Sequence, residues 1–185
     1  MKGAQPTALE VNRPTRFQVW RTITLGTYKG VDAYRDALEA AGIKIGNAAD
    51  EILGRPAFPY ARTKTDVELA LVSAPELGVE TESALADVYK RATHLGLALC
   101  PPEVGPHLRL VYRNQPLGES LNIAMEPVAT YGGEATILSL VNFGSGLALL
   151  GGNGEAEFMV PRTFRFVFAL PRLEARRDPP SAPTK

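Results

Sequence analysis

The stretch EATILSLVNFGSGLALL, residues 134–150, holds two apolar, β-branched runs on either side of Gly144-Ser145-Gly146. Runs of this length joined by a short glycine-containing turn predict two antiparallel strands, over residues 134–143 and 147–150. A glycine-rich turn at residues 151–154 is expected to end the second strand. Further strands are expected on both sides of this pair, over residues 16–25, 66–73, 108–113, 120–126 and 164–170.

Helical periodicity is confined to the first half of the chain. Apolar residues recur at three- and four-residue steps over residues 31–41 and 82–95, and a short helix is expected from Asn47 to Gly54. Most of the strands follow the helices, so the sequence predicts an α+β fold: a mostly antiparallel sheet or meander with helices packed on one side. The expected organisation is one domain over residues 16–171 between flexible tails at residues 1–15 and 172–185.

The composition excludes several classes of protein. The 185 residues include 20 Lys+Arg and 20 Asp+Glu, so bulk positive charge does not favour nucleic acid as a partner. The single cysteine, Cys100, rules out an internal disulfide or a zinc site built on several thiolates. No apolar run is long enough to span a membrane and no secretory signal is present, which favours a cytoplasmic protein. No cofactor or metal is expected.

Negative charge is concentrated in the second half of the predicted domain. No Lys or Arg occurs between Arg113 and Arg162, and five glutamates lie in this interval: Glu119, Glu126, Glu134, Glu155 and Glu157. Such a distribution would repel a polyanion. A neutral, basic or apolar partner, either a protein or a small molecule, is therefore expected.

Polar side chains are densest in residues 99–127, LCPPEVGPHLRLVYRNQPLGESLNIAMEP. If a strand begins at Pro106, His107 and Arg109 share one of its faces, and a hairpin would bring Glu126 to the same face. Carboxylates beside a histidine and an arginine suit general acid–base chemistry, although the solvated face of an antiparallel sheet has the same composition. The candidate ligand-binding residues are Glu103, His107, Arg109, Tyr112, Gln115, Glu119 and Glu126.

The pattern LGLxLCPxEVGPxLRLxY followed by QPxGExLxIxMEP resembles a segment of a family of uncharacterised bacterial proteins of similar length. The WRTITLG stretch near the start and the later IxIG turn resemble the same proteins, so the likeness covers most of residues 17–170. The resemblance implies no activity and no cofactor. It implies that Glu103, Arg109, Tyr112, Gln115 and Glu119 belong to one structural unit.

Three functions remain open from the sequence. The first is a non-enzymatic binding or accessory protein of bacterial or mobile-element origin, because each catalytic motif tested lacks a required residue or spacing. The second is a hydrolase of saccharide or peptidoglycan type that uses Glu103 with Glu119 or Glu126 and orients its substrate through Arg109. The third is a nucleic-acid-associated factor that acts through its basic tails.

Overall fold

Alternating and amphipathic runs form strands and helices over residues 17–171, the part of the chain described by the computed structural model. The helices are α1 (Val31–Ala40), α2 (Asn47–Leu53), α3 (Leu85–His94) and α4 (Val104–Val111). The strands are β1 (Arg21–Leu25), β2 (Lys44–Ile45), β3 (Thr65–Ser73), β4 (Ser83–Ala84), β5 (Ser120–Ile123), β6 (Val128–Ala129), β7 (Ala135–Asn142), β8 (Leu147–Asn153), β9 (Met159–Val160) and β10 (Arg165–Leu170). None of the helices in this described part combines the length and apolar character needed to cross a membrane.

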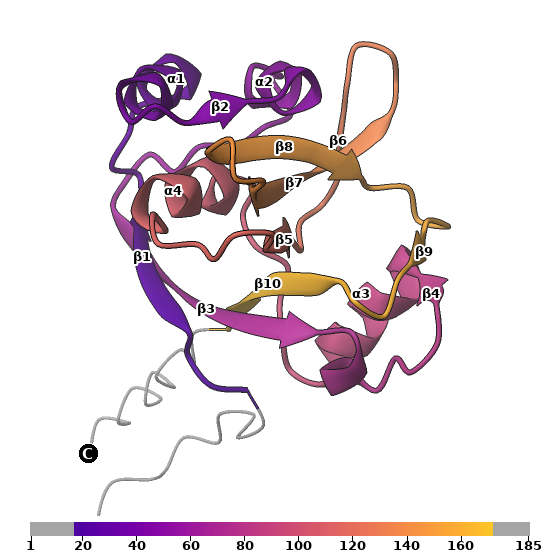
Figure 1. The fold of residues 1–185 in the computed structure, drawn as a ribbon. Helices are drawn as coiled ribbons and strands as arrows, with labels where there is room; N and C mark the ends of the chain where they lie inside the picture. Colours follow the sequence, from indigo (N-terminus) through magenta and orange to yellow (C-terminus); the bar gives the residue numbers. More distant parts are fainter. Residues whose placement is uncertain (1–16, 172–185) are drawn as a thin grey trace, which may run out of the picture.

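Eight of these strands form one sheet in the order β1-β3-β10-β5-β7-β8-β2, and β6 also pairs with β7 (Figure 1). The pairs are antiparallel except β10 with β5 and β2 with β8. The small strands β4 and β9 form a separate antiparallel pair. The predicted α+β class with a mostly antiparallel sheet is therefore confirmed.

Helices cover both faces of the sheet. The central strand β10 has apolar side chains on each face, and each face needs a covering layer. Phe166 and Phe168 of β10 pack in one buried cluster with residues of α3. The alternating Val167 and Ala169 pack in a second cluster with residues of α1, α2 and α4. The expectation that the helices pack on one side is therefore wrong, because α3 lies on the face of the sheet opposite to α1, α2 and α4.

The sheet curves around α4. This helix packs against β1, which is one edge of the sheet, and also against β7 and β8 near the other edge. Figure 1 shows α4 between β1 and the β7–β8 pair. One helix can contact the first, fifth and sixth strands of a seven-strand row only if the sheet wraps around it, so α4 lies inside the concave face.

The prediction of a strand over residues 108–113 is wrong, because residues 108–111 form the last turn of helix α4 and residues 112 and 113 follow it outside any strand. Val104, Leu108 and Val111 follow helical spacing, and Pro106 lies in the first helical turn, where proline is tolerated. Apolar and polar residues alternate from Leu108 onward, as they do in a strand. The run is too short to distinguish the two-residue period of a strand from the 3.6-residue period of a helix.

The glycine-rich residues 151–154 do not form the expected turn. Strand β8 continues through Asn153, and Gly151 pairs with Leu138 of β7. A Cβ atom on Gly151 would lie 2.7 Å from the Ala48 Cβ. Glycine therefore serves here as a contact surface for α2 and not as a turn residue.

Several other boundaries differ slightly from the sequence prediction. β1 begins at Arg21 and not at residue 16, and β5 ends at Ile123 and not at residue 126. The short helix expected from Asn47 to Gly54 is confirmed as α2. The predicted tails, residues 1–15 and 172–185, lie outside the described residues.

We predict that Gly151→Ala lowers the free energy of unfolding by about 1–3 kcal/mol, the usual range for overpacking a well-packed site. The added methyl would meet Ala48 at 2.7 Å and the Thr136 side chain at 3.0 Å, so α2 must move away from β8. Urea unfolding measures the change. The matched control is Gly132→Ala at an exposed site, where the nearest atom lies 3.5 Å away and almost no change is expected. Equal stability of the two variants would contradict this packing.

Candidate functional site

Six of the seven candidate residues form two groups around α4. Glu103 and His107 lie at the N-terminal end of the helix and are buried. Arg109, Tyr112, Gln115 and Glu119 form a second group at its C-terminal end. Glu126 is exposed and belongs to neither group. The residues expected together on one strand face are therefore separated by the helix.

The Glu103 side chain, 1% exposed, receives three hydrogen bonds from distant parts of the chain. Its Oε1 accepts from the Gly26 amide at 3.0 Å and from the Tyr34 hydroxyl at 2.7 Å. Its Oε2 accepts from the Ala61 amide at 2.6 Å. Burying a carboxylate is costly unless its oxygens are satisfied, and three donors do so here. Glu103 thereby joins α4 to the loop after β1, to α1 and to the connection before β3.

His107 lies one helical turn after Glu103 and is linked to it through Tyr34. The Tyr34 hydroxyl is 3.2 Å from His107 Nδ1. Because this hydroxyl donates its proton to Glu103, its oxygen is available to accept from a protonated Nδ1. In the neutral ring this arrangement leaves Nε2 unprotonated, as an acceptor.

Burial determines the protonation states of Tyr34 and His107. It raises the pKa of Tyr34, as does the hydrogen bond to Glu103, so the phenol keeps its proton. Burial also lowers the pKa of His107, and the charge of Glu103 opposes this effect only in part. The imidazole is consequently neutral at pH 7.

Arg109 is a buried cation held by neutral oxygens. Its guanidinium donates to the Gln115 side chain and to the Tyr112 carbonyl. Gln115 in turn donates to the Leu140 carbonyl at 3.0 Å, which connects α4 to β7. Burial lowers the pKa of Arg109 to about 10, so it remains charged at neutral pH. With no exposed surface, Arg109 positions other groups and does not contact a ligand.

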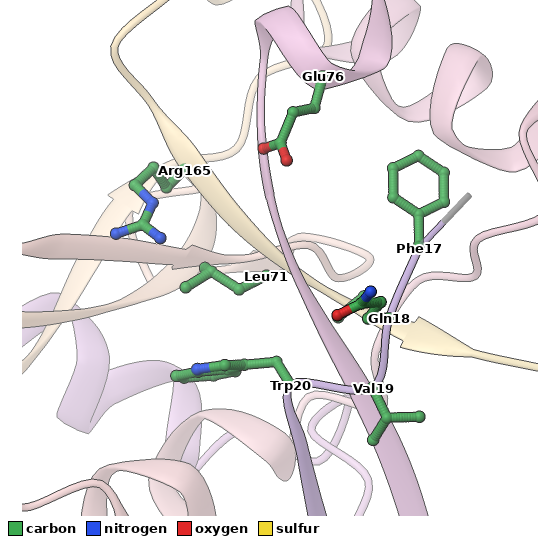
Figure 2. A pocket seen from close by; sticks show the side chains of 8 residues that line it. Phe17, Gln18, Val19, Trp20, Leu71, Glu76 and Arg165 are labelled. Atoms are coloured by element: carbon green, nitrogen blue, oxygen red, sulfur yellow. The ribbon is translucent and has the colours of Figure 1, made fainter. Parts of the chain in front are cut away.

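Tyr112 and Glu119 extend the second group toward a different cavity. The Tyr112 hydroxyl donates to Glu119 at 2.8 Å, and Arg165 pairs with Glu119 at 2.7 Å. Figure 2 shows the cavity beside Arg165, with Trp20, Leu71 and Glu76 around it.

The charged groups around this cavity are already occupied. Glu76 accepts hydrogen bonds from the amide and hydroxyl of Ser73, which lower its pKa. Arg165 is held by its ion pair with Glu119. The cavity beside Arg165 is therefore a less suitable ligand site than the groove beside His107 that is described next.

A groove runs between β1 and α4, and we call it the β1–α4 groove. It encloses about 600 Å³ and is lined by Arg21, Thr22, Ile23, Thr24, Thr27, Tyr28, His107 and Val111. Four consecutive residues of β1 line it, and β3 contributes none. The groove therefore follows the edge of β1 that faces away from β3.

Main-chain groups of β1 point into this groove. The Gly26 amide donates to Glu103 at the start of α4, so it points away from β3. Successive amides of a strand alternate in direction, so those of Thr24 and Thr22 point the same way. In the sheet order of the described residues β1 is terminal and pairs only with β3. The Thr22 and Thr24 amides thus face the groove without a partner strand, whereas the Thr24 carbonyl accepts a hydrogen bond from the Thr27 hydroxyl at 2.9 Å.

Sequence reasoning missed most of this site. Tyr34, Gly26 and Ala61 are separated from Glu103 by 69, 77 and 42 residues, so no local spacing links them. The available signal was the i,i+4 spacing of Glu103 and His107, which the strand prediction concealed.

Two further observations concern side chains with reactive or metal-binding chemistry. Cys100 is buried, its Sγ donates to the Val167 carbonyl at 3.3 Å, and burial raises the pKa of the thiol, which disfavours the reactive thiolate form. No group of three His, Cys, Asp or Glu side chains within residues 17–171 is arranged to hold a metal ion.

Comparison of the chain with models of protein families, with curated proteins and with solved structures gives no match. The resemblance of residues 99–127 to bacterial proteins therefore stays a prediction.

We predict that Glu103→Gln lowers the free energy of unfolding by roughly 2–4 kcal/mol, because the amide group would turn a donor toward one of the three donors that now bind the carboxylate. Urea unfolding measures the effect. Glu126→Gln, the same change at an exposed glutamate, is the control and should leave the stability unchanged. If both variants unfold at the same urea concentration, Glu103 does not hold the site together.

We predict that His107 titrates with a pKa below its usual 6.5, because Tyr34, Tyr28 and the surrounding apolar side chains bury it and only Glu103 favours its protonation. The unfolded chain binds this proton first as the pH falls, so the free energy of unfolding decreases from pH 6.5 down to the folded pKa. NMR titration of the ring protons measures the pKa, and a His94→Gln variant assigns the signals. A pKa above 6.5 would contradict the burial.

Proposed function

We propose that this chain is a binding protein that captures an extended segment of a partner protein in the β1–α4 groove. The segment adds a strand to the open edge of β1. The observation that carries this proposal is the run of four consecutive β1 residues along the groove, with the Thr22 and Thr24 amides directed into it. Main-chain pairing at an open sheet edge is a common mode of peptide recognition.

The dimensions of the groove suit a short segment. β1 has five residues and α4 has eight, so the two walls are about 17 and 12 Å long. Four or five residues of an extended peptide span this distance. An open edge is usually protected by lysine, proline or a bulge that twists it away, yet β1 has threonine at both groove-facing main-chain positions.

The lining favours a neutral segment. It contains no carboxylate, and the His107 imidazole is neutral. Its one cation, Arg21, lies over the rings of Trp20 and Tyr112 at 5.0 and 4.6 Å. The sequence favours a neutral, basic or apolar partner, and this lining supports a neutral or apolar one. A second copy of the chain is less suitable, because it would bring its own α4 to the pairing edge.

The geometry gives less support to the other two functions. Glu103 and Glu119 have different partners at opposite ends of α4, Glu126 is exposed, and Arg109 is fully buried. A hydrolase would need two of these carboxylates around one cavity. The basic tails invoked for nucleic-acid binding lie outside the described residues. A cytoplasmic location remains part of the proposal and is supported by the single buried thiol of Cys100.

We predict that Thr22→Pro abolishes peptide binding and leaves the fold intact. Proline removes an amide that faces the groove, and an edge strand tolerates proline where the missing donor faces away from its neighbour. The probe is a displayed library of random linear heptapeptides, from which binders to the wild-type chain are selected and synthesised. Binding of these peptides is measured by calorimetry, and circular dichroism checks the fold.

Thr22→Val is the matched control, since it changes the same side chain but keeps the amide. It should bind the selected peptides as the wild type does. The proposal is overturned if no peptide is selected or if Thr22→Pro binds as well as Thr22→Val. It is also overturned if the wild type is a dimer that Thr22→Pro converts to a monomer, because a second copy would then occupy the edge.

A further inference from the structure

We infer that the β1–α4 groove selects a serine or threonine followed two residues later by an apolar residue. This inference rests on the proposed function, because it assumes that a strand pairs with β1. It assigns one side-chain contact to His107 and another to Val111, the two α4 residues that line the groove.

His107 presents a hydrogen-bond acceptor to the groove. Tyr34 donates to Glu103 and accepts from His107 Nδ1, so the remaining ring nitrogen, Nε2, carries a lone pair. No described residue is recorded as a partner of this nitrogen. A bound segment can therefore supply a donor here, and serine and threonine carry an uncharged hydroxyl donor on a short side chain.

An acidic side chain is disfavoured at the same position. A carboxylate would face the Nε2 lone pair, and Arg21, the cation of the lining, is already stacked over two aromatic rings. The site thus separates a hydroxyl from a carboxylate of similar size.

Val111 supplies the second contact. It lies four residues after His107 on the same helical face, and it is 46% exposed despite being aliphatic. The rise between the two positions is about 6 Å. Side chains two residues apart on one face of a strand are about 6.6 Å apart, which matches this spacing. A residue two positions from the hydroxyl therefore reaches Val111.

The order of the two residues follows from the direction of α4. Glu103, before the helix, binds Gly26 after the end of β1, whereas the Tyr112 ring, after the helix, lies under Arg21 at the start of β1. Helix and strand therefore run in opposite directions. Antiparallel pairing is the more stable form per residue, and a segment paired in this way runs with α4. It meets His107 first and Val111 second.

Three capped heptapeptides test this inference on the wild-type chain. Each has a central tripeptide flanked by Gly-Thr and Thr-Gly: Ser-Thr-Val, Ala-Thr-Val or the reversed Val-Thr-Ser. Calorimetry at pH 7.5 should show the Ser-Thr-Val peptide binding about tenfold more tightly than the Ala-Thr-Val peptide, the effect of one well-formed hydrogen bond. The reversed peptide should also bind more weakly. The preference for serine over alanine should decrease as the pH falls below the pKa of His107.

Protein variants assign the two contacts. His107→Phe should bind the serine and alanine peptides equally, whereas Val111→Thr, at an exposed site, should weaken both and keep the preference for serine. The comparison of peptides on the wild type needs no variant and decides the result if His107→Phe does not fold. This inference is overturned if all three peptides bind the wild type equally. If Thr22→Pro also abolishes that binding, the strand-addition proposal still holds. Binding that Thr22→Pro does not change would overturn both.

Discussion

The buried carboxylate of Glu103 connects the parts of the chain that surround the groove. It accepts hydrogen bonds from the loop after β1, from Tyr34 on α1 and from the Ala61 amide. The carboxylate therefore fixes the distance between β1 and α4 and, through Tyr34, the tautomer of His107. Both the spacing of the groove walls and the hydrogen-bonding state of His107 therefore depend on the Glu103 side chain.

Curvature of the sheet makes this arrangement possible. A flat sheet would leave the β1 edge far from β7 and β8, and α4 could not contact all three strands. With α4 inside the concave face, the helix stands beside the edge of β1 and provides the second wall of the groove. The buried Arg109 and Gln115 anchor the other end of α4 to β7. Both ends of the helix are thus held by polar networks.

Periodicity was sufficient to predict most of the fold. The helices α1 and α3 and the long strands β3, β7 and β10 have the regular spacing of apolar residues from which they were expected. It failed at α4, where Leu108 to Tyr112 alternate over a run too short to distinguish a helix from a strand. That one error concealed that Glu103 and His107 lie one helical turn apart, where Tyr34 links them. The partners of Glu103 are distant in sequence and required the tertiary structure.

The most direct test of the groove as a strand-binding edge is amide hydrogen exchange at β1, measured with and without a bound peptide. The Thr22 and Thr24 amides should exchange rapidly in the free chain and slowly in the complex, since they point into the groove. The Ile23 amide, which points toward β3, should be protected in both states. Slow exchange of Thr22 and Thr24 in the free chain, or no change on binding, would contradict an open edge that pairs with a partner.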